Sequence, residues 1–370
     1  NLTLTFNFTA RDGDGDAVSS TFQVVVNDDA PLAGQADTGL VDEDGGLWGG
    51  NPFGDGDTFG VGTKTSGSLA IAWGADNDLK SEALVNGAIG TVDDPIGRTV
   101  SFTAADGGAV LGGTAEFVSG SLVTPDITVT DTASGQTIDV SAALTSDGVS
   151  LSYRLSYHTD GSGHWDGGYV LLAYKSTGDA NRASDQVFKV TLDPTSEHGS
   201  YKFELLGNLD HPVANIEDNL DLTFHLIATD ADGDQIHTDI TVAVNDDSPI
   251  TVLSIPDGNV EEEQFVPSGN RQTQGNEDTS GAGDGDHSIR GHLIDLTTAH
   301  VDGLLNIAWG ADSGNSNVDG GFTGTQVNGD RSVVFATGSG ASPTTLSADD
   351  VRAFLGVTDG NLSLDPASLT

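Results

Sequence analysis

The chain has 370 residues, with 13 Lys and Arg against 56 Asp and Glu, and a formal net charge of −43. A surface this acidic repels nucleic acids and anionic lipid headgroups, so the composition argues against both as partners. The chain contains no Cys and no Met, which excludes disulfides, thiolate metal sites and cysteine nucleophiles. No apolar run reaches the roughly 18 residues of a membrane-spanning helix, so membrane insertion is not expected.

Short alternating runs of apolar and polar residues begin at the first residues, where Leu2, Leu4 and Phe6 alternate with polar side chains. A second such run follows a short acidic loop, which predicts a hairpin. Frequent strand signals with almost no helical periodicity predict an all-β fold of tandem immunoglobulin- or cadherin-like β-sandwiches. Residues 347–355 are the one predicted helix. Later strands are predicted at residues 149–157, 188–192, 201–205, 220–226 and 236–244.

Internal repetition organises the chain. Residues 1–31 and 219–249 align without a gap, and Asp12 falls on Asp230, an offset of 218 residues (230 minus 12). A second block, Ile-Ala-Trp-Gly-Ala-Asp, occurs at residues 71–76 and again at 307–312. We therefore predict the C-terminal part of one repeat at 1–33, a complete repeat at 34–250 and the N-terminal part of the next at 251–370. A further division of the complete repeat is suggested near residue 145.

Two acidic motifs recur with the repeat. One lies between two strands, as Asp-x-Asp-Gly-Asp, and the other closes the last strand, as Asn-Asp-Asp-x-Pro; an acidic trio follows at residues 42–44 and 261–263. Carboxylate oxygens are the ligands that Ca²⁺ takes, and a bound ion can stabilise a secreted fold that lacks disulfides. We expect loop, strand end and trio to converge on calcium at each junction. The expected ligands are Asp12, Asp14, Asp16, Asn27, Asp28, Asp29, Glu43, Asp230, Asp232, Asp234, Asn245, Asp246, Asp247 and Glu261.

Simpler interpretations of the acidic loops stand beside this one. A single Asp-Gly-Asp is most often only a hairpin turn, because both residue types suit turn backbone angles. Recurrence of both motifs in register, in a chain of charge −43, favours metal binding. An EF-hand is excluded because its twelfth position requires Glu, whereas Gln23 and Thr241 stand there.

Catalytic motifs are missing from the sequence. It contains neither a Gly-x-Ser-x-Gly nucleophile elbow nor a Walker-type phosphate loop, so a non-enzymatic protein is expected. His158 and His164 occur with Asp160 and Asp166 in one loop, which we interpret as a polar surface loop because the spacing fixes no third ligand. Trp73 and Trp309 lie in the repeated apolar block and are expected to pack in the core rather than stack on sugars.

Four sequence blocks carry a resemblance to a known family: residues 201–212, 217–222, 229–234 and 244–249. Their order resembles the tandem repeats of giant bacterial repeats-in-toxin adhesins, which are exported by type I secretion. The Asn-Asp-Asp-x-Pro ending is also similar to the calcium-binding linker of cadherins, with Asp29 and Asp247 replacing its second Asn.

The resemblance implies a structural extender module, extracellular or at the bacterial cell surface, that folds with calcium and adjoins other repeats of the same chain. The adhesion ligand of the distal domain is not identified by these residues. The alternative is a module that itself binds a carbohydrate or host ligand. Exposed aromatic side chains such as Trp165 and Tyr169 would favour that alternative.

Overall fold

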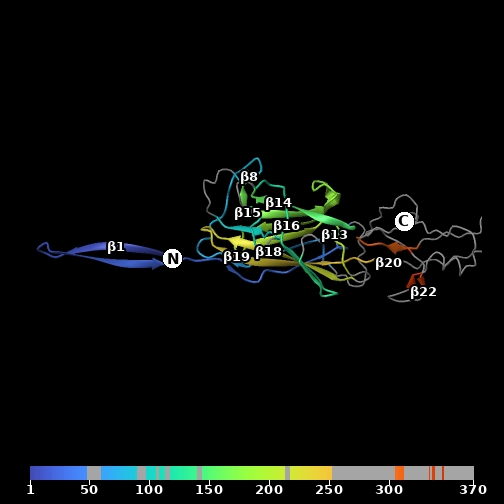
Figure 1. Cartoon of the computed structure of the whole chain (residues 1–370), viewed down its shortest axis with the longest axis horizontal. Helices are drawn as coiled ribbons and strands as arrows, with labels where there is room; N and C mark the ends of the chain where they lie inside the picture. The colour runs from blue at the N-terminus through green and yellow to red at the C-terminus, as the bar shows by residue number, and fades with distance from the viewer. Residues whose placement is uncertain are drawn as a thin grey trace, which may run out of the picture. The chain divides into compact units, whose positions relative to one another are not determined.

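The structure, a computed structural model, is almost entirely β (Figure 1). It describes residues 1–47, 60–89, 97–105, 108–112, 117–139, 144–212, 217–251 and 305–311, together with 333, 336–337 and 344–345. The only helical element in this part of the chain is the 3₁₀ turn η1, Ala183–Asp185. The predicted all-β class is therefore confirmed, while the predicted helix at 347–355 lies outside the described residues.

One layer of the sandwich is a seven-stranded antiparallel sheet. Its strands follow the order β10-β14-β15-β16-β17-β5, with β13 paired to β14. Long alternating runs form the central strands, which explains why they were recognisable in the sequence. The strands are β5 (Lys64–Ser68), β10 (Ser121–Val123), β13 (Thr145–Ser146), β14 (Val149–Thr159), β15 (Trp165–Lys175), β16 (Gln186–Asp193) and β17 (Ser200–Leu205).

The second layer is a six-stranded sheet in the order β12-β11-β18-β19-β4, with β9 also paired to β18. Its centre is the hairpin β18–β19, and its one parallel pair joins β4 to β19, with Asn245 beside Asp42. The strands are β4 (Gly39–Asp42), β9 (Thr99–Phe102), β11 (Ile127–Asp131), β12 (Thr137–Asp139), β18 (Asn219–Thr229) and β19 (Gln235–Asn245).

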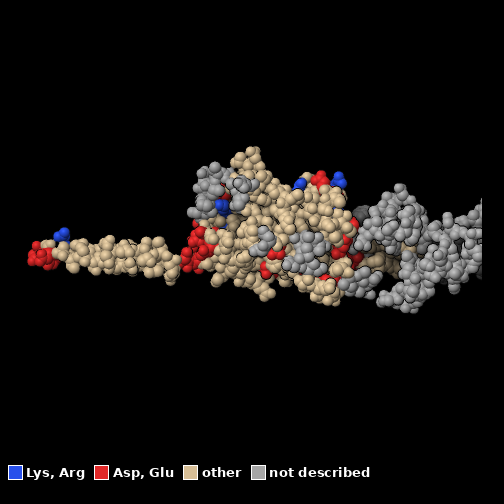
Figure 2. Space-filling model, in the orientation of Figure 1, with Lys and Arg blue, Asp and Glu red and all other residues tan. Residues whose placement is uncertain are grey.

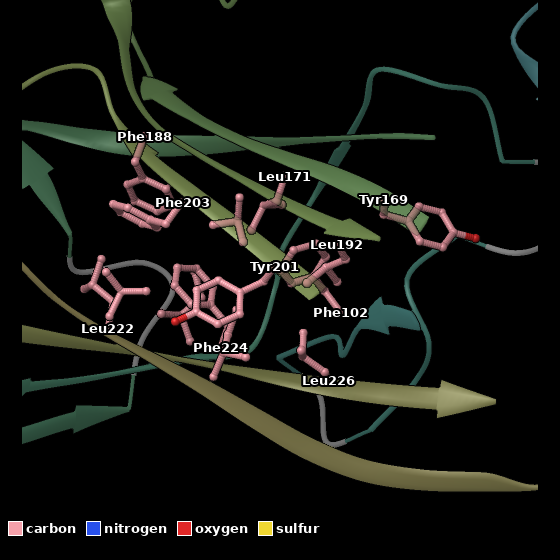
Figure 3. Close-up of a cluster of buried hydrophobic side chains, with 14 of the residues drawn as sticks. Phe102, Tyr169, Leu171, Phe188, Leu192, Tyr201, Phe203, Leu222, Phe224 and Leu226 are labelled. Atoms are coloured by element: carbon pink, nitrogen blue, oxygen red, sulfur yellow. The ribbon is translucent and has the colours of Figure 1, made fainter. Parts of the chain in front are cut away.

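The core lies between these two sheets and is filled by the inward residues of the alternating runs (Figure 3). The ring of Phe224 on β18 lies 5.9 Å from that of Phe188 on β16 and 6.3 Å from that of Phe203 on β17, so the aromatic contacts cross the sandwich. All three rings are fully buried. At about 25 cal/mol per Å² of apolar surface, such burial is the main force that holds the layers together.

Strands from both sides of residue 145 contribute to both sheets. β10 pairs with β14 in one sheet, and β11 pairs with β18 in the other. The suggested division of the complete repeat near residue 145 is therefore wrong. Between β12 and β13 the chain passes from the six-stranded sheet to the seven-stranded sheet. This change of sheet interrupts the alternating pattern without ending the domain.

An isolated hairpin precedes the sandwich. It consists of β1 (Leu2–Arg11) and β2 (Ala17–Val26), which pair with each other and with no other described strand. In this hairpin Leu2 lies opposite Val26. The residues 218 positions later, Leu220 and Val244, lie opposite each other in β18–β19, so the two hairpins have the same register. Phe6 is 45% exposed, whereas its counterpart Phe224 is buried. The hairpin thus reproduces the central strands of the sandwich without the layers that would cover them.

Several short strand pairs complete the described residues. β3 (Leu32–Ala33) pairs with β6 (Ile71–Ala72), and β20 (Ile250–Thr251) pairs with β21 (Ile307–Ala308). In both copies of the repeated block, the opening Ile-Ala is therefore a short strand that pairs with the residues directly after the Asn-Asp-Asp-x-Pro motif. By contacts the chain forms two compact units. Of the described residues, those up to Ser248 and residues 309–311 belong to one unit, and residues 249–251 and 305–308 belong to the other. Two further pairs are β7 (Leu84–Val85) with β8 (Ala88–Ile89) and β22 (Ala336–Thr337) with β23 (Thr344–Thr345).

Positive charge collects around one carboxylate of the seven-stranded sheet. Lys64, Lys189 and Lys202 place their ammonium groups 2.5–3.1 Å from the oxygens of Glu204, whose side chain is almost fully buried. Burial opposes ionisation of Glu204, but the three hydrogen bonds bring its pKa down to about 2. This carboxylate is therefore neutralised by side chains, unlike those at the ends of the sandwich.

Candidate metal sites

The two hairpin loops have the same internal structure. In the first, Asp12 Oδ1 accepts hydrogen bonds from the backbone N–H groups of Gly15 and Asp16, at 3.1 and 2.9 Å. In the second, Asp230 Oδ1 accepts from Gly233 and Asp234, at 3.1 and 2.8 Å. One oxygen of the leading Asp thus shapes the turn, as expected for Asx-type turns. In each loop the three alternating carboxylates offer ligand atoms within 4.8 Å of one another.

The second loop lies in a larger acidic group, which we call the N-terminal cluster: Asp28, Asp76, Asp230 and Asp232. Ligand atoms of Asp28, Asp76 and Asp232 lie within 4.8 Å of one another, and Ala231 N–H donates to the backbone oxygen of Asp76 at 2.9 Å. Asp230 is 2% exposed, and its Oδ2 is buried without a hydrogen-bond partner among the described residues. The cluster combines the strand end of one repeat with the loop of the next.

Charge repulsion in the N-terminal cluster is visible in the acidities of its members. Burial and the neighbouring carboxylate of Asp232 raise the pKa of Asp230 to about 6. Burial, followed by the charges of Asp232 and Asp28, also raises the pKa of Asp76. None of the four carboxylates forms an ion pair with a described lysine or arginine. A cation bound among these carboxylates would offset their mutual repulsion.

The second Asp of each Asn-Asp-Asp motif caps a turn. Asp29 Oδ2 accepts a hydrogen bond from Ala75 N–H at 3.0 Å, and Asp247 Oδ2 accepts from Ala311 N–H at 2.7 Å. The preceding glycine, Gly74, has φ +78°, and a Cβ built on it would lie 2.5 Å from Asp29 Oδ2. The two blocks found repeated in the sequence therefore contact each other. The carboxylates of Asp29 and Asp247, predicted to be metal ligands, each use one oxygen to hold a Trp-Gly-Ala turn.

A second acidic group, the C-terminal cluster, lies where β4 and β19 end. Glu43 N–H donates to the carbonyl of Asn245 at 3.2 Å, and Glu43 Oε1 accepts from the backbone N–H of Leu209 at 2.6 Å. The backbone N–H of Asp246 donates to the carbonyl of Asp218 at 2.9 Å. The cluster comprises Asp42, Glu43, Asp131, His211, Asp218, Asn245 and Asp246.

Burial distinguishes the C-terminal cluster from ordinary surface charge. Asp131 is 1% exposed, Asn245 5% and Asp218 8%, and each has one buried side-chain oxygen without a hydrogen-bond partner among the described residues. The backbone N–H of Ser134 holds the pKa of Asp131 below its usual value, which favours the charged form. Neither Asp131 nor Asp218 pairs with a described lysine or arginine.

His211 is the nitrogen-bearing member of this cluster. Its side chain is 1% exposed, and its Nδ1 lies 3.0 Å from Asp218 Oδ1. Burial lowers the pKa of His211, so the neutral ring is favoured and donates its Nδ1–H to the carboxylate. A neutral ring orients Asp218 without cancelling its charge.

Figure 2 shows that acidic residues gather in patches on a surface that otherwise carries few of them.

The predicted convergence of loop, strand end and trio at a single junction is wrong. The loop at Asp230–Asp234 and the motif at Asn245–Asp247 lie at opposite ends of the 11-residue β19, roughly 33 Å apart at 3.3 Å per residue. Asp12, Asp14 and Asp16 are separated in the same way from Asn27 by β2. Glu43 joins the strand end of its own repeat, because β4 runs parallel to β19. Glu261 lies outside the described residues.

Five members of the two clusters were not among the expected ligands: Asp42, which lies in the acidic trio, and Asp76, Asp131, His211 and Asp218. Asp76 closes the repeated Ile-Ala-Trp-Gly-Ala-Asp block, so its recurrence at 312 was an available signal. His211 and Asp218 fall in the blocks that resemble adhesin repeats. Asp131 ends β11 and gave no signal, because only pairing with β18 brings it to the cluster.

The predictions made for the aromatic residues and for His158 have different outcomes. Trp73 is 3% exposed and lies in the core, as predicted, with the Arg98 guanidinium 5.1 Å from its ring centre. Trp165 and Tyr169 are also buried, so neither is the exposed aromatic that a ligand-binding module would use. His158 is not a free surface residue, because its Nδ1 lies 2.7 Å from Asp166 Oδ2.

Comparison with known proteins gives no assignment: the chain matches no protein-family model, and no curated protein is similar to it in sequence. The described residues contain no helix of the length and apolarity needed to cross a membrane.

Proposed function

We propose that this chain is a calcium-rigidified structural extender module of a large secreted or cell-surface adhesin, and that it has no enzymatic activity. Its task would be to hold a distal binding domain away from the cell through a series of stiff repeats. Calcium would be the element that converts a chain of sandwiches into a stiff rod segment, and adjacent repeats of the same chain would be its partners.

The buried carboxylates of Asp131 and Asp218 carry this proposal, because each has one oxygen without a hydrogen-bond partner among the described residues. Burying a charge that no cation neutralises costs free energy, so a bound ion would stabilise the fold. Calcium accepts six to eight oxygen ligands in flexible geometry and suits a group of Asp carboxylates and an Asn carbonyl oxygen. His211, which offers nitrogen, would act as the donor that orients Asp218.

The composition of the N-terminal cluster supports a role in joining repeats. Asp28 follows the last strand of one repeat, whereas Asp76 and Asp232 belong to the next. An ion bound by all three would tie the two together at a fixed point. The Asp29 cap on the Trp73-Gly74-Ala75 turn adds a second connection that needs no metal.

The secretion route and the adhesin context rest on the sequence resemblance alone. A chain without Cys, unfolded at low calcium and folded at high calcium, suits export through a narrow channel followed by folding outside. The alternative of a carbohydrate-binding module loses the aromatic residues suggested for it, because Trp165 and Tyr169 are buried.

Thermal unfolding with excess calcium, with chelator and with magnesium tests the proposal. A ligand present at a hundredfold excess over its dissociation constant stabilises by about 2.7 kcal/mol per site, so two clusters would contribute about 5 kcal/mol. For a domain of this size each kcal/mol corresponds to about 2–4 °C. Magnesium, which needs strict octahedral geometry and keeps its waters, should substitute poorly. An identical melt in calcium and in chelator would refute the proposal.

A further inference from the structure

Three adjacent strands of the seven-stranded sheet bring a histidine and two carboxylates together, away from both acidic clusters. His158 lies near the end of β14, Asp166 at the start of β15 and Asp193 at the end of β16. One ligand atom from each lies within 4.8 Å of the others, and His158 Nδ1 is 2.7 Å from Asp166 Oδ2. The sequence alone gave no third ligand, because Asp193 is distant in the chain.

The backbone is irregular where these side chains meet. The register of β14 against β15 shifts between Tyr157 and Thr159, a bulge that turns His158 relative to a regular strand. Gly168 has no room for a side chain, because a Cβ there would lie 2.1 Å from the carbonyl oxygen of Leu192, the residue before Asp193. This close approach places Asp166 beside Asp193. The arrangement is thus built by the fold rather than by mobile surface side chains.

The two carboxylates have little other compensation. Asp166 is 5% exposed, and its second oxygen accepts from Gly168 N–H at 3.2 Å. Asp193 Oδ1 accepts from the backbone N–H and hydroxyl of Thr195, whereas its Oδ2 has no hydrogen bond to a described residue. Arg98 lies close enough for the charge of Asp193 to act on its guanidinium, but it donates to the carbonyls of Thr195 and Ser196, stacks on Trp73 and forms no ion pair with either carboxylate.

We propose that His158, Asp166 and Asp193 form a binding site for a divalent transition metal ion of the Zn²⁺ class, separate from the calcium clusters. Imidazole nitrogen with carboxylate oxygen is a donor set that suits zinc, whereas calcium takes oxygen ligands. Metal binding displaces the proton that His158 Nδ1 shares with Asp166. A simple His–Asp hydrogen bond would not require Asp193 within ligand distance, and its presence favours a metal site.

Access to this site comes from a cavity of about 620 Å³ whose lining includes His158, Asp193, His198 and Tyr201. Three protein ligands leave at least one coordination position of a zinc ion for water or another small ligand. The site therefore has both an entry path and an open position. It does not depend on the proposed calcium role, because it lies on other residues.

The test uses the full chain without an affinity tag, saturated with calcium so that the acidic clusters are occupied. Titration with Co²⁺, followed by its visible absorption, and with Zn²⁺, followed by calorimetry, should show one equivalent bound. His158→Gln should abolish binding, and Asp193→Asn should weaken it at least tenfold. His164→Gln is the matched control, because His164 lies in the same loop but contacts Ser81, and its affinity should equal that of the wild type.

The outcomes separate clearly. Failure of the calcium-saturated wild type to bind either ion, or equal affinities in His158→Gln, Asp193→Asn and wild type, would overturn the zinc site. Asp193→Asn keeps the Oδ1 acceptor for Thr195, so it should fold even if His158→Gln does not. Calcium-dependent melting of His158→Gln should match that of the wild type, so failure here leaves the calcium proposal unaffected.

Discussion

Replacing Asp218 by asparagine should stabilise the protein without calcium and leave its stability in calcium nearly unchanged. The substitution keeps the size of the side chain and the oxygen that accepts from His211, but it removes one negative charge from the C-terminal cluster. Without calcium, that charge is repelled by its neighbours in a buried place. With calcium, the same charge is part of the ion's binding site.

The size of each effect follows from the geometry. Ligand atoms of Asp218 and Asp246 lie within 4.8 Å. At an effective dielectric constant of about 20, two unit charges at that separation repel by about 3.5 kcal/mol. His211 and solvent reduce this, so we expect Asp218→Asn to stabilise the calcium-free protein by about 1–3 kcal/mol. In calcium, a 10- to 100-fold loss of affinity subtracts about 1.4–2.7 kcal/mol from that gain, so the net change in stability should be close to zero.

Calorimetric or circular-dichroism melts in chelator and in excess calcium, at matched ionic strength, measure both effects. At about 2–4 °C per kcal/mol the melting temperature should rise by several degrees in chelator and change little in calcium. Asp239→Asn is the control, because Asp239 lies exposed on β19 and pairs with His225. If Asp218→Asn lowers the melting temperature equally in both conditions, Asp218 is only a structural hydrogen-bond acceptor and the reasoning fails.

Three further substitutions probe other parts of the structure by thermal melts. Glu204→Gln should lower the free energy of unfolding by about 1–2 kcal/mol at pH 7, after allowance for solvent screening. This loss should disappear as the pH falls from 4.5 to 2, because the folded-state pKa of Glu204 lies below the usual value of 4.5. An equal loss at both pH values would contradict this. Gly74→Ala should cost about 1–2 kcal/mol through its positive φ and its contact with the capping carboxylate, whereas Gly161→Ala, with open space around it, should cost much less. Phe224→Ala should cost about 3–5 kcal/mol because the ring is fully buried, while Phe6→Ala, at the equivalent exposed position, should leave the melt nearly unchanged.

The fold was readable from the sequence where local pattern and tertiary environment agree. Alternation along β14 and β18 predicted their strands because one face of each is buried. The offset of 218 residues predicted that the first hairpin copies β18–β19, and the two registers agree. The short strands β6 and β8 gave no usable pattern, since two residues cannot establish a period.

The candidate sites were readable only in part, for a geometric reason. Motifs close in sequence were assumed to be close in space, but a strand carries its two ends far apart, so Asp230 and Asn245 belong to different clusters. Partners such as Asp131 reach the C-terminal cluster through sheet pairing, which sequence separation does not reveal. Recurrence identified Asp28 and Asp232 as notable residues without showing that they meet.

The parallel pairing of β4 with β19 decides how the sandwich would carry a mechanical load. The chain enters the sandwich ahead of Gly39 and leaves it after Asn245, and these residues lie at opposite ends of the paired segment. Tension on the two chain ends therefore slides the strands past each other and loads their hydrogen bonds together, in shear, instead of opening them one at a time. The C-terminal cluster lies where β4 and β19 end, so an ion held there would act as a clamp on the bonds that bear the force.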